Sequence, residues 1–276
     1  MKNLNKEGTK MKSPLWENPG GHNWLGVWTL YMREVRRFTK IYTQTMLAPV
    51  VTTLLFLAVF SLVIGPRSNS FVGEVPFLEF LVPGLIMMSV IQNSFANASS
   101  AFMTAKVQGS IVDLLMAPLG PIEILIAHIL AGVTRGLFVF TASFLLLWIL
   151  GIIDFPEHFF WMILYLIQGG ITLAIIGMLA GIWAQKFDQL SIISNFVIQP
   201  LAFLSGTFYS IERLPESLKI LAYCNPFFYA IDGLRFSFIG LSDASPILGS
   251  AVLLCCNFAL SIFAWYILKT GYRLRS

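Results

Sequence analysis

The 276-residue chain is 57% hydrophobic and only 12% charged, whereas about 25% of the residues in an average soluble domain are charged. This composition excludes an ordinary soluble domain and indicates a membrane protein. The formal net charge is +4. However, the basic residues are not interleaved with aromatic ones in the way that would indicate nucleic-acid binding.

The N-terminal part of the chain contains two predicted segments. Residues 1–21 are polar and rich in Lys, Gly and Pro. Because they lack the early apolar core of a signal peptide, we expect a disordered cytoplasmic tail. In residues 22–44, Trp24, Trp28 and Tyr31 recur at steps of four and three. This pattern predicts an amphipathic helix in the cytoplasmic interface, although an ordinary juxtamembrane anchor would show the same pattern.

Six apolar segments are long enough to cross a bilayer, whose core requires about 20 residues of helix. They lack the period-2 alternation of barrel strands, which favours helices. One of them carries the pair Gly177 and Gly181, whose GxxxG spacing permits close helix packing. The predicted fold is an all-α membrane protein with six transmembrane helices, at residues 46–64, 77–103, 122–150, 159–183, 190–208 and 247–268.

Lys and Arg are distributed unevenly between the two sides of these spans. Thirteen of them fall in the N-terminal segment, the second and fourth loops and the C-terminus, whereas four fall in the other loops and Arg135 lies inside a span. The positive-inside rule therefore predicts that both termini are cytoplasmic.

The loop after the second span has a helical pattern of its own. Apolar side chains recur at helical spacing over residues 106–116, before Pro118, Gly120 and Pro121 end the helix. A turn alone would need fewer residues, so we expect a short cytoplasmic helix with one apolar side. The residues of interest are Lys106, Val107, Gly109, Ile111, Asp113, Leu114 and Leu115.

Polar residues form a stripe on each of two spans. Asn93 and Asn97 follow Ser89 at steps of four, and Asn195 and Gln199 are four apart in the fifth span. Each set lies on one side of its helix. Two interpretations remain open: the stripes face each other across a substrate pathway between two copies of the chain, or they form hydrogen bonds between helices.

Ionisable residues also occur in or beside the spans. His128 and Arg135 lie seven residues apart on one face of the third span, and Glu79 and Glu123 lie near span ends. Because isolated charges are costly in a bilayer, we expect these residues to form structural ion pairs.

Residues 210–243 are too polar to cross the membrane and too aromatic for a solvated loop. Two stretches within them, 215–223 and 226–238, have helical apolar spacing and begin near a proline. We expect two short re-entrant helices that dip into the outer leaflet before the sixth span.

Nucleotide-binding and catalytic motifs are absent from the sequence. It has no GxxxxGK[ST] loop, no Gly-Lys dipeptide and no HExxH motif. We therefore expect that the chain binds no cofactor or metal and has no enzyme activity of its own.

Three stretches together carry a family resemblance. They are FLVPGLIMMSVIQNSFANASS at 80–100, GSIVDLLMAPLGPIEILIAHIL at 109–130, and residues 199–240 with their SGTFY, LP and NPFFYAIDGLR elements. With the amphipathic helix and the six spans, they resemble the ABC-2 type permeases, which are membrane subunits of exporters with an ABCG-like architecture. Drug, Nod-factor and polysaccharide export permeases are among the proteins that the chain resembles.

The resemblance implies a bacterial inner-membrane exporter whose transmembrane domain is residues 45–276. Two copies of the chain, or the chain and a sister permease, would pair with two copies of a separate ATP-binding subunit, which holds ATP and Mg. The assembly would contact membrane lipid but no nucleic acid. Residues 106–116 would be the coupling helix that docks on the ATPase, and residues 22–44 the connecting helix.

The substrate implied by the resemblance is an amphipathic, lipid-linked or glycan molecule, and the sequence does not choose among these classes. Two other functions remain as alternatives. A secondary transporter would show inverted repeats with broken helices, and we find no convincing repeat. A membrane assembly scaffold is the other alternative.

Overall fold

The computed structural model describes residues 23–64 and 75–273, so the expected tail at 1–21 lies outside the described residues. The described part contains six helices that are long and apolar enough to cross a membrane, as predicted. The first half comprises α1 (Trp24–Thr39), the π-helix η2 (Thr43–Leu47), α2 (Ala48–Ile64), α3 (Phe77–Val107), α4 (Ile111–Met116) and α5 (Pro121–Ile149). The second half comprises α6 (Phe159–Trp183), α7 (Phe187–Ile193), η4 (Ser194–Ile198), α8 (Gln199–Leu204), η5 (Ile211–Arg213), α9 (Glu216–Tyr223), α10 (Pro226–Ile239) and α11 (Pro246–Thr270).

The observed spans agree with the predicted ones to within a few residues. The fourth, α6, has both predicted ends, whereas α3 runs on to Val107 instead of ending at residue 103. The fifth span consists of α7, η4 and α8 and covers Phe187–Leu204, so it begins and ends before the predicted 190–208. It stops early because Gly206, with φ of +73°, turns the chain.

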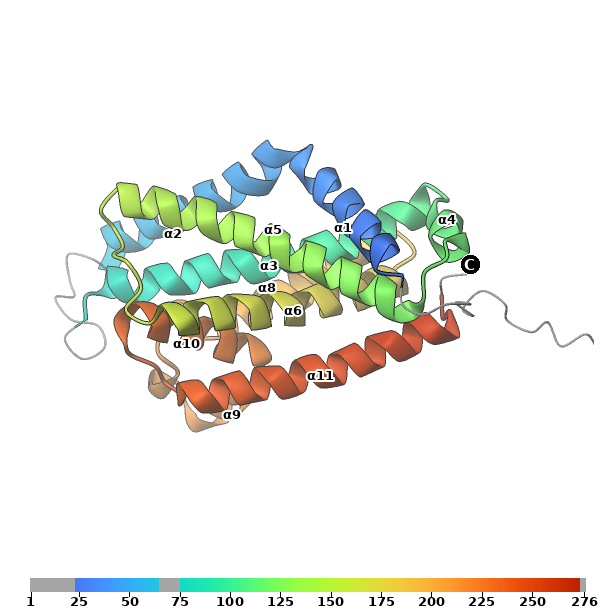
Figure 1. The fold of residues 1–276 in the computed structure, drawn as a ribbon. Coiled ribbons are helices and arrows are strands. Elements are labelled where there is room, and N and C mark those ends of the chain that lie inside the picture. Colours follow the sequence, from blue (N-terminus) through green and yellow to red (C-terminus); the bar gives the residue numbers. More distant parts are fainter. Residues whose placement is uncertain (1–22, 65–74, 274–276) are drawn as a thin grey trace, which may run out of the picture.

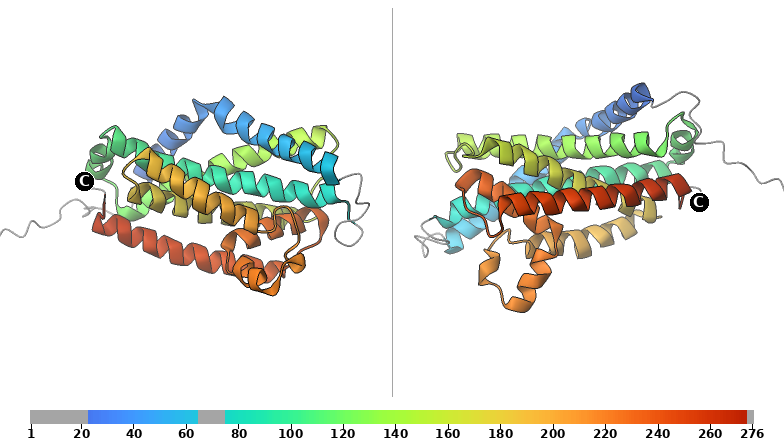
Figure 2. Two further views of the ribbon diagram at one scale, coloured as in Figure 1. Left: turned by 180° about the vertical axis from the view of Figure 1, so that it is seen from behind. Right: turned by 60° about the horizontal axis from the view of Figure 1, so that its bottom comes forward.

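The bundle is built around α3, which packs against α5, α6 and α10 (Figure 1). α1, α4 and the C-terminal end of α11 lie at one end of the bundle, and α9 and α10 lie at the other (Figure 1). Seen from behind, the fifth span lies along α3 (Figure 2). The expected helices at 215–223 and 226–238 are present as α9 and α10, while their depth in a bilayer remains a prediction.

Close approach of α6 to α3 depends on the predicted GxxxG pair. A Cβ atom on Gly177 would lie 2.4 Å from the carbonyl oxygen of Phe95, and one on Gly181 would lie 2.6 Å from that of Ser99. Because the obstacle is backbone, a larger side chain at either position would force the two helices apart.

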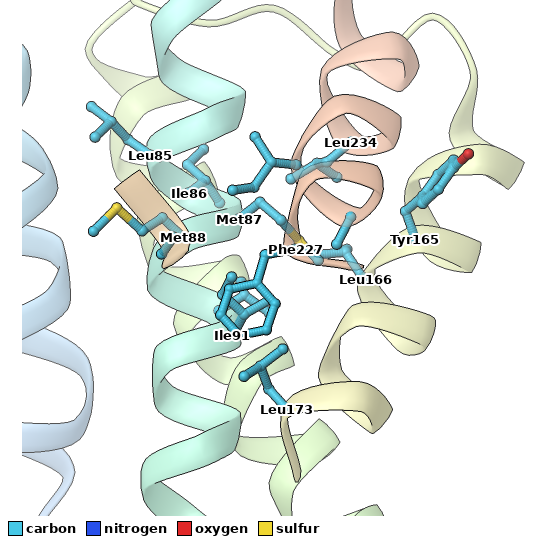
Figure 3. Close-up of a cluster of buried hydrophobic side chains, with 14 of the residues drawn as sticks. Leu85, Ile86, Met87, Met88, Ile91, Tyr165, Leu166, Leu173, Phe227 and Leu234 are labelled. Carbon is cyan, nitrogen blue, oxygen red and sulfur yellow. The ribbon is translucent and has the colours of Figure 1, made fainter. Parts of the chain in front are cut away.

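The centre of the bundle is a cluster of buried apolar side chains to which α3, α6 and α10 contribute (Figure 3). Met87 and Ile91 of α3 meet Leu166 of α6 and Phe227 and Leu234 of α10. In a bilayer the lipid is as apolar as these side chains, so they stabilise the bundle mainly through tight packing. α10 therefore belongs to the core and is not a surface loop.

Three of the spanning helices leave most of their surface uncovered. In the most apolar stretch of α3, 72% of the residues are buried, but the corresponding share is 11% for the first span and 17% for both the fifth span and α11. These faces are apolar and available to lipid or to another protein chain.

Candidate functional site

The two predicted polar stripes meet in a pocket of about 230 Å³ between α3 and the fifth span. Gln92 and Asn93 line it from α3, and Asn195 and Gln199 line it from η4 and α8. Ser194, Phe95, Ala96 and Ile198 complete the lining. The pocket is thus an amide-rich hollow within an apolar bundle, and none of its described lining residues carries a carboxylate.

Asn97 was also predicted to line the pathway, but it does not line this pocket. Its side chain is buried and its Oδ1 accepts a hydrogen bond from Nη2 of Arg37, at 3.2 Å. The structure therefore brings Asn93, Asn195 and Gln199 together and places Asn97 at a junction between α1 and α3.

Asn93 is held in one orientation by two partners. Its Oδ1 accepts from Nη2 of Arg135 at 3.2 Å, and its Nδ2 donates to the carbonyl oxygen of Ser89 at 3.0 Å. Arg135 is the central residue of α5. Nε of Arg135 and Nε2 of Gln92 are buried and have no hydrogen-bond partner among the residues that the structure describes.

The ion pairs expected for His128 and Arg135 are not formed in the part of the chain that the structure describes. Arg135 contacts the Asn93 amide instead of a carboxylate, and Nδ1 of His128 lies 2.8 Å from the carbonyl oxygen of Ile124. Glu79 is exposed, and Glu123 accepts from the backbone N–H of Asn23 at 3.4 Å. For His128 and Arg135 the prediction was wrong, because charge spacing along one helix does not show which neighbour the side chains face.

A buried ionic cluster fastens α1 to α3. The Glu34 carboxylate is 2% exposed and binds Nε of Arg37 at 2.8 Å and Nη2 of Arg33 at 3.1 Å. Arg37 also donates to the carbonyl oxygen of Asn97 at 2.8 Å and to Oγ of Ser100 at 2.9 Å. Burial acts to raise the pKa of Glu34, but the adjacent cations outweigh burial and hold that pKa below its usual value.

The sequence analysis identified α1 as amphipathic but not the side that the protein buries. The aromatic side chains Trp24 and Trp28 are exposed, and the buried stripe contains Leu30, Glu34 and Phe38. The buried side could have been recognised from Glu34, an acidic residue that lies within an apolar stripe and three residues before Arg37. Whether α1 lies in the membrane interface remains a prediction.

A larger groove, of about 1010 Å³, separates α1 from the end of α3 and from α4. Arg33 and Arg36 of α1 and Lys40 just after it line one side, and Gln108 and Asp113 line the opposite side. Nδ2 of Asn23 donates to the carbonyl oxygen of Pro118 at 3.2 Å, which joins the start of α1 to the chain after α4.

The predicted coupling segment at 106–116 is two pieces rather than one helix. Lys106 and Val107 end α3, Gly109 has φ of +72° in the turn, and α4 covers only Ile111–Met116. Residues other than glycine rarely adopt this φ, which is not helical. The prediction of one helix over residues 106–116 was therefore wrong, because the chain turns at Gly109.

The apolar side predicted for docking is divided between the interior and the surface. Ile111 and Leu114 are 7% and 4% exposed and pack in the chain's own core, with Leu115 partly buried beside them. Val107 is exposed, as are two apolar residues that were not singled out, Val112 and Met116. Asp113 is also exposed.

Lys106 contacts α6 instead of the surface. Its Nζ donates to the carbonyl oxygens of Ile182 and Ala184, at the C-terminal end of α6. Nη1 of Arg273 donates to the neighbouring carbonyl of Trp183 at 3.0 Å. Cations are favourable at this end of a helix, so α6 is joined to the end of α3, just before the turn that leads to α4.

At the other end of the bundle, a second charged cluster holds α10, and the sequence analysis missed it. Arg235 is 1% exposed, donates to the carbonyl oxygens of Phe80 and Gly206, and has Nη1 3.6 Å from the Asp232 carboxylate. Asp232 accepts from the backbone N–H groups of Asp243 and Ala244, each at 3.0 Å. We call these residues the Arg235 cluster.

Comparison with known proteins identifies the family. The family model described as "ABC-2 type transporter" matches residues 26–239. The Inner membrane transport permease YadH of Escherichia coli (strain K12) is 36% identical over 257 residues, an alignment that covers 92% of this chain and 98% of that protein.

Nodulation protein J of Rhizobium leguminosarum bv. viciae is 24% identical over 238 residues, covering 85% of this chain and 89% of that protein. Nodulation protein J of Sinorhizobium fredii (strain NBRC 101917 / NGR234) is 22% identical over 245 residues, an alignment that covers 87% of this chain and 90% of that protein. Together with the six apolar helices, these matches describe a multi-pass transport permease of the inner membrane. The chain belongs to the ABC-2 type transporter family.

Proposed function

We propose that this permease forms the transmembrane pathway of an exporter and moves an amphipathic, lipid-linked or glycan molecule outward. A separate ATP-binding subunit, present in two copies, supplies the energy and holds ATP and Mg. The observation that carries the proposal is the amide-lined pocket between α3 and the fifth span, because a polar hollow inside an apolar bundle needs a polar occupant.

The ATPase docks at the end of the bundle that carries α4. Its contacts are the exposed apolar residues Val107, Val112 and Met116, with Asp113 beside them. A few buried apolar anchors dominate most interfaces. The motion of α4 is transmitted to the permease core by Ile111 and Leu114, which pack inside and do not contact the partner. Lys106 transmits the same motion to α6.

A second copy of the permease covers the exposed faces of the first and fifth spans. Asn195 and Gln199 lie exposed on the fifth span while they also line the pocket. In the proposed homodimer the pocket lies beside the axis, with membrane lipid on the remaining faces. A disulfide crosslink between copies through Asn195→Cys, formed in at least one nucleotide state, is the expected result.

Both termini and α4 face the cytoplasm in this assembly. Single cysteines at Gln108 and Glu216, in a variant that lacks the three native cysteines, test this orientation. An impermeant maleimide added to sealed cells should label Glu216→Cys and should label Gln108→Cys only after lysis. Labelling of Gln108→Cys in sealed cells would reverse the orientation. Ser68, expected on the outer side, lies outside the described residues.

The docking surface is tested by the pair Val112→Asp and Met116→Asp in one variant. Both side chains are exposed, so the change in unfolding free energy should be within about 1 kcal/mol. Copurification of the ATPase should fall at least about tenfold, because buried hot-spot residues contribute about 2 kcal/mol or more. Ile220→Asp, on exposed α9 at the opposite end, is the matched control.

Two results would overturn the docking proposal. One is a folded double variant that retains its ATPase at the wild-type level. The other is an equal loss of ATPase in the Ile220→Asp control.

A further inference from the structure

We propose that the pocket between α3 and the fifth span, together with Arg135, binds an anionic group, so that the ligand is an amphiphile with an anionic headgroup. The inference rests on the proposed function, because it assigns a chemical class to the molecule in the pathway. It follows from charge and from unpaired donors around Asn93.

Arg135 carries a positive charge that no described residue neutralises. A guanidinium stays protonated in proteins, and Arg135 lies at the centre of a spanning helix, where its one hydrogen bond goes to a neutral amide. The buried Glu34 carboxylate already binds both Arg33 and Arg37. An ionisable group inside a membrane that lacks an opposite charge indicates a functional site.

Three buried polar atoms at this place have no hydrogen-bond partner among the described residues. Oγ of Ser94 can donate or accept, whereas Nε of Arg135 and Nε2 of Gln92, which lines the pocket, can only donate. A ligand that satisfies both must offer acceptor oxygens. Water could accept from the Gln92 amide, but water does not neutralise the charge of Arg135.

Asn93 connects the cation to the pocket. Its Oδ1 faces Arg135 at 3.2 Å, and its side chain lines the pocket. Arg135 therefore acts as a positioning residue for Asn93, and its charge acts on the pocket across one amide group. In the low dielectric of the bundle, charge interactions extend over several ångströms, so the pocket favours an anion.

An apolar tail would have room beside the same pocket. Phe95 and Ile198 line it, and Phe196 and Val197 on the neighbouring turn are exposed. A headgroup in the pocket would thus leave its hydrocarbon chain against apolar helix surface. The shared chemistry is a phosphate, sulfate or carboxylate headgroup, on either a transported molecule or a resident phospholipid.

The test is direct binding to the permease alone, in nanodiscs that contain only phosphatidylcholine. The probe is dodecyl phosphate with a dansyl group at the chain end, and its reference is the matching dansyl dodecyl phosphocholine. Because both probes partition into the bilayer, the quantity compared is the ratio of their affinities. Binding does not require the ATPase, so a failure of the docking proposal leaves this test intact.

Removal of the charge should remove the preference for the anion. We expect Arg135→Gln to lower the ratio of phosphate to phosphocholine affinity by about tenfold or more, and Arg135→Lys to keep it within about threefold of wild type. Arg36→Gln removes an exposed cation of α1 and should leave the ratio unchanged. A wild-type ratio in Arg135→Gln would overturn the proposal.

Asn93→Asp keeps the test decisive if Arg135→Gln fails to fold. It places a carboxylate of similar size 3.2 Å from the guanidinium, so it should neutralise the site and abolish the preference for the phosphate probe. A purely structural Arg135 predicts instead that Asn93→Asp folds well and retains the wild-type ratio, which would also overturn the proposal.

The two sources of the headgroup are separated in the complex with the ATPase. For a transported amphiphile, ATP should release the bound phosphate probe, and phosphatidylglycerol in the nanodisc should compete weakly. Retention of the probe in the presence of ATP, with strong competition by phosphatidylglycerol, would overturn its assignment as a transported ligand and identify a resident lipid.

Discussion

Two buried arginines, Arg235 and Arg135, show how differently this bundle treats a positive charge. Arg235 donates to two backbone carbonyls, lies near the Asp232 carboxylate, and has its guanidinium carbon 3.8 Å from the centre of the Phe80 ring. Within the described ranges 23–64 and 75–273, Arg135 has one hydrogen bond, to Asn93, and a buried Nε without a partner.

The difference follows from what the neighbouring helices provide. At Arg235, the carbonyl groups of the turn after α8 and of the start of α3 converge with the acid of α10, so the charge has several partners inside the protein. At Arg135, α3 provides only an amide. A fully paired buried charge fixes structure, whereas an incompletely paired one is retained at a cost in stability and indicates a binding role.

The largest expected effect is the loss of stability when Arg235 is replaced. Arg235→Met leaves the buried Asp232 carboxylate without its cation, which should lower the unfolding free energy by about 3–5 kcal/mol. Denaturant unfolding in detergent, followed by circular dichroism, measures the change. Lys219→Met, in α9, removes only a surface ion pair with Glu216 and should shift the unfolding curve only slightly. If Arg235→Met were as stable as Lys219→Met, the claim that Arg235 stabilises the fold would be wrong.

Glu34 forms a second paired cluster, and its replacement should have the next largest effect. Glu34→Gln removes charged hydrogen bonds to Arg33 and Arg37, and we expect a loss of about 1–3 kcal/mol. Because the folded pKa of Glu34 is below its unfolded value, its stabilisation is present above that unfolded value, about 4.3, and is lost as the pH falls through the folded pKa.

A pH series tests the Glu34 prediction. The stability difference between wild type and Glu34→Gln should be constant from about pH 6 to 7 and should shrink below about pH 4. A difference that does not change down to about pH 3 would show that the carboxylate is not the stabilising form.

A smaller and opposite effect is expected at the unpaired arginine. Asn93→Asp supplies the carboxylate that Arg135 lacks, and this charge-assisted hydrogen bond should raise the unfolding free energy by about 1 kcal/mol. Asn195→Asp, in the same pocket but on the exposed fifth span, is the control and should not stabilise. Equal effects of the two substitutions would show that Arg135 does not determine the response.

The spans could be predicted from the sequence because an apolar run of about 20 residues has the length that a helix needs to cross a bilayer. Both ends of α6 were predicted correctly, and the paired glycines Gly177 and Gly181 contact α3 as their spacing suggested. The stripes that contain Asn93 and Asn195 were also recognised, since a spacing of four places polar groups on one side of a helix.

What the sequence could not predict is which surface each side chain meets. Ile111 and Leu114 have the same spacing whether they bind a partner or pack inside, and the structure packs them inside. Asp232 and Arg235 are three residues apart in the sequence, but their burial depends on α3 and α8. The charge of Arg135 could be read from the sequence, whereas its lack of a carboxylate partner among the described residues required the positions of α1 and α3.

Replacement of Arg135 by methionine is the most direct test of the contrast between the two arginines. A desolvated cation without a carboxylate contributes little to folding. The unfolding free energy of Arg135→Met should therefore be within about 1 kcal/mol of the wild-type value, whereas in the same assay Arg235→Met should lose about 3–5 kcal/mol. A loss in Arg135→Met as large as that in Arg235→Met would contradict the account, because Arg135 would then be a structural residue like its counterpart.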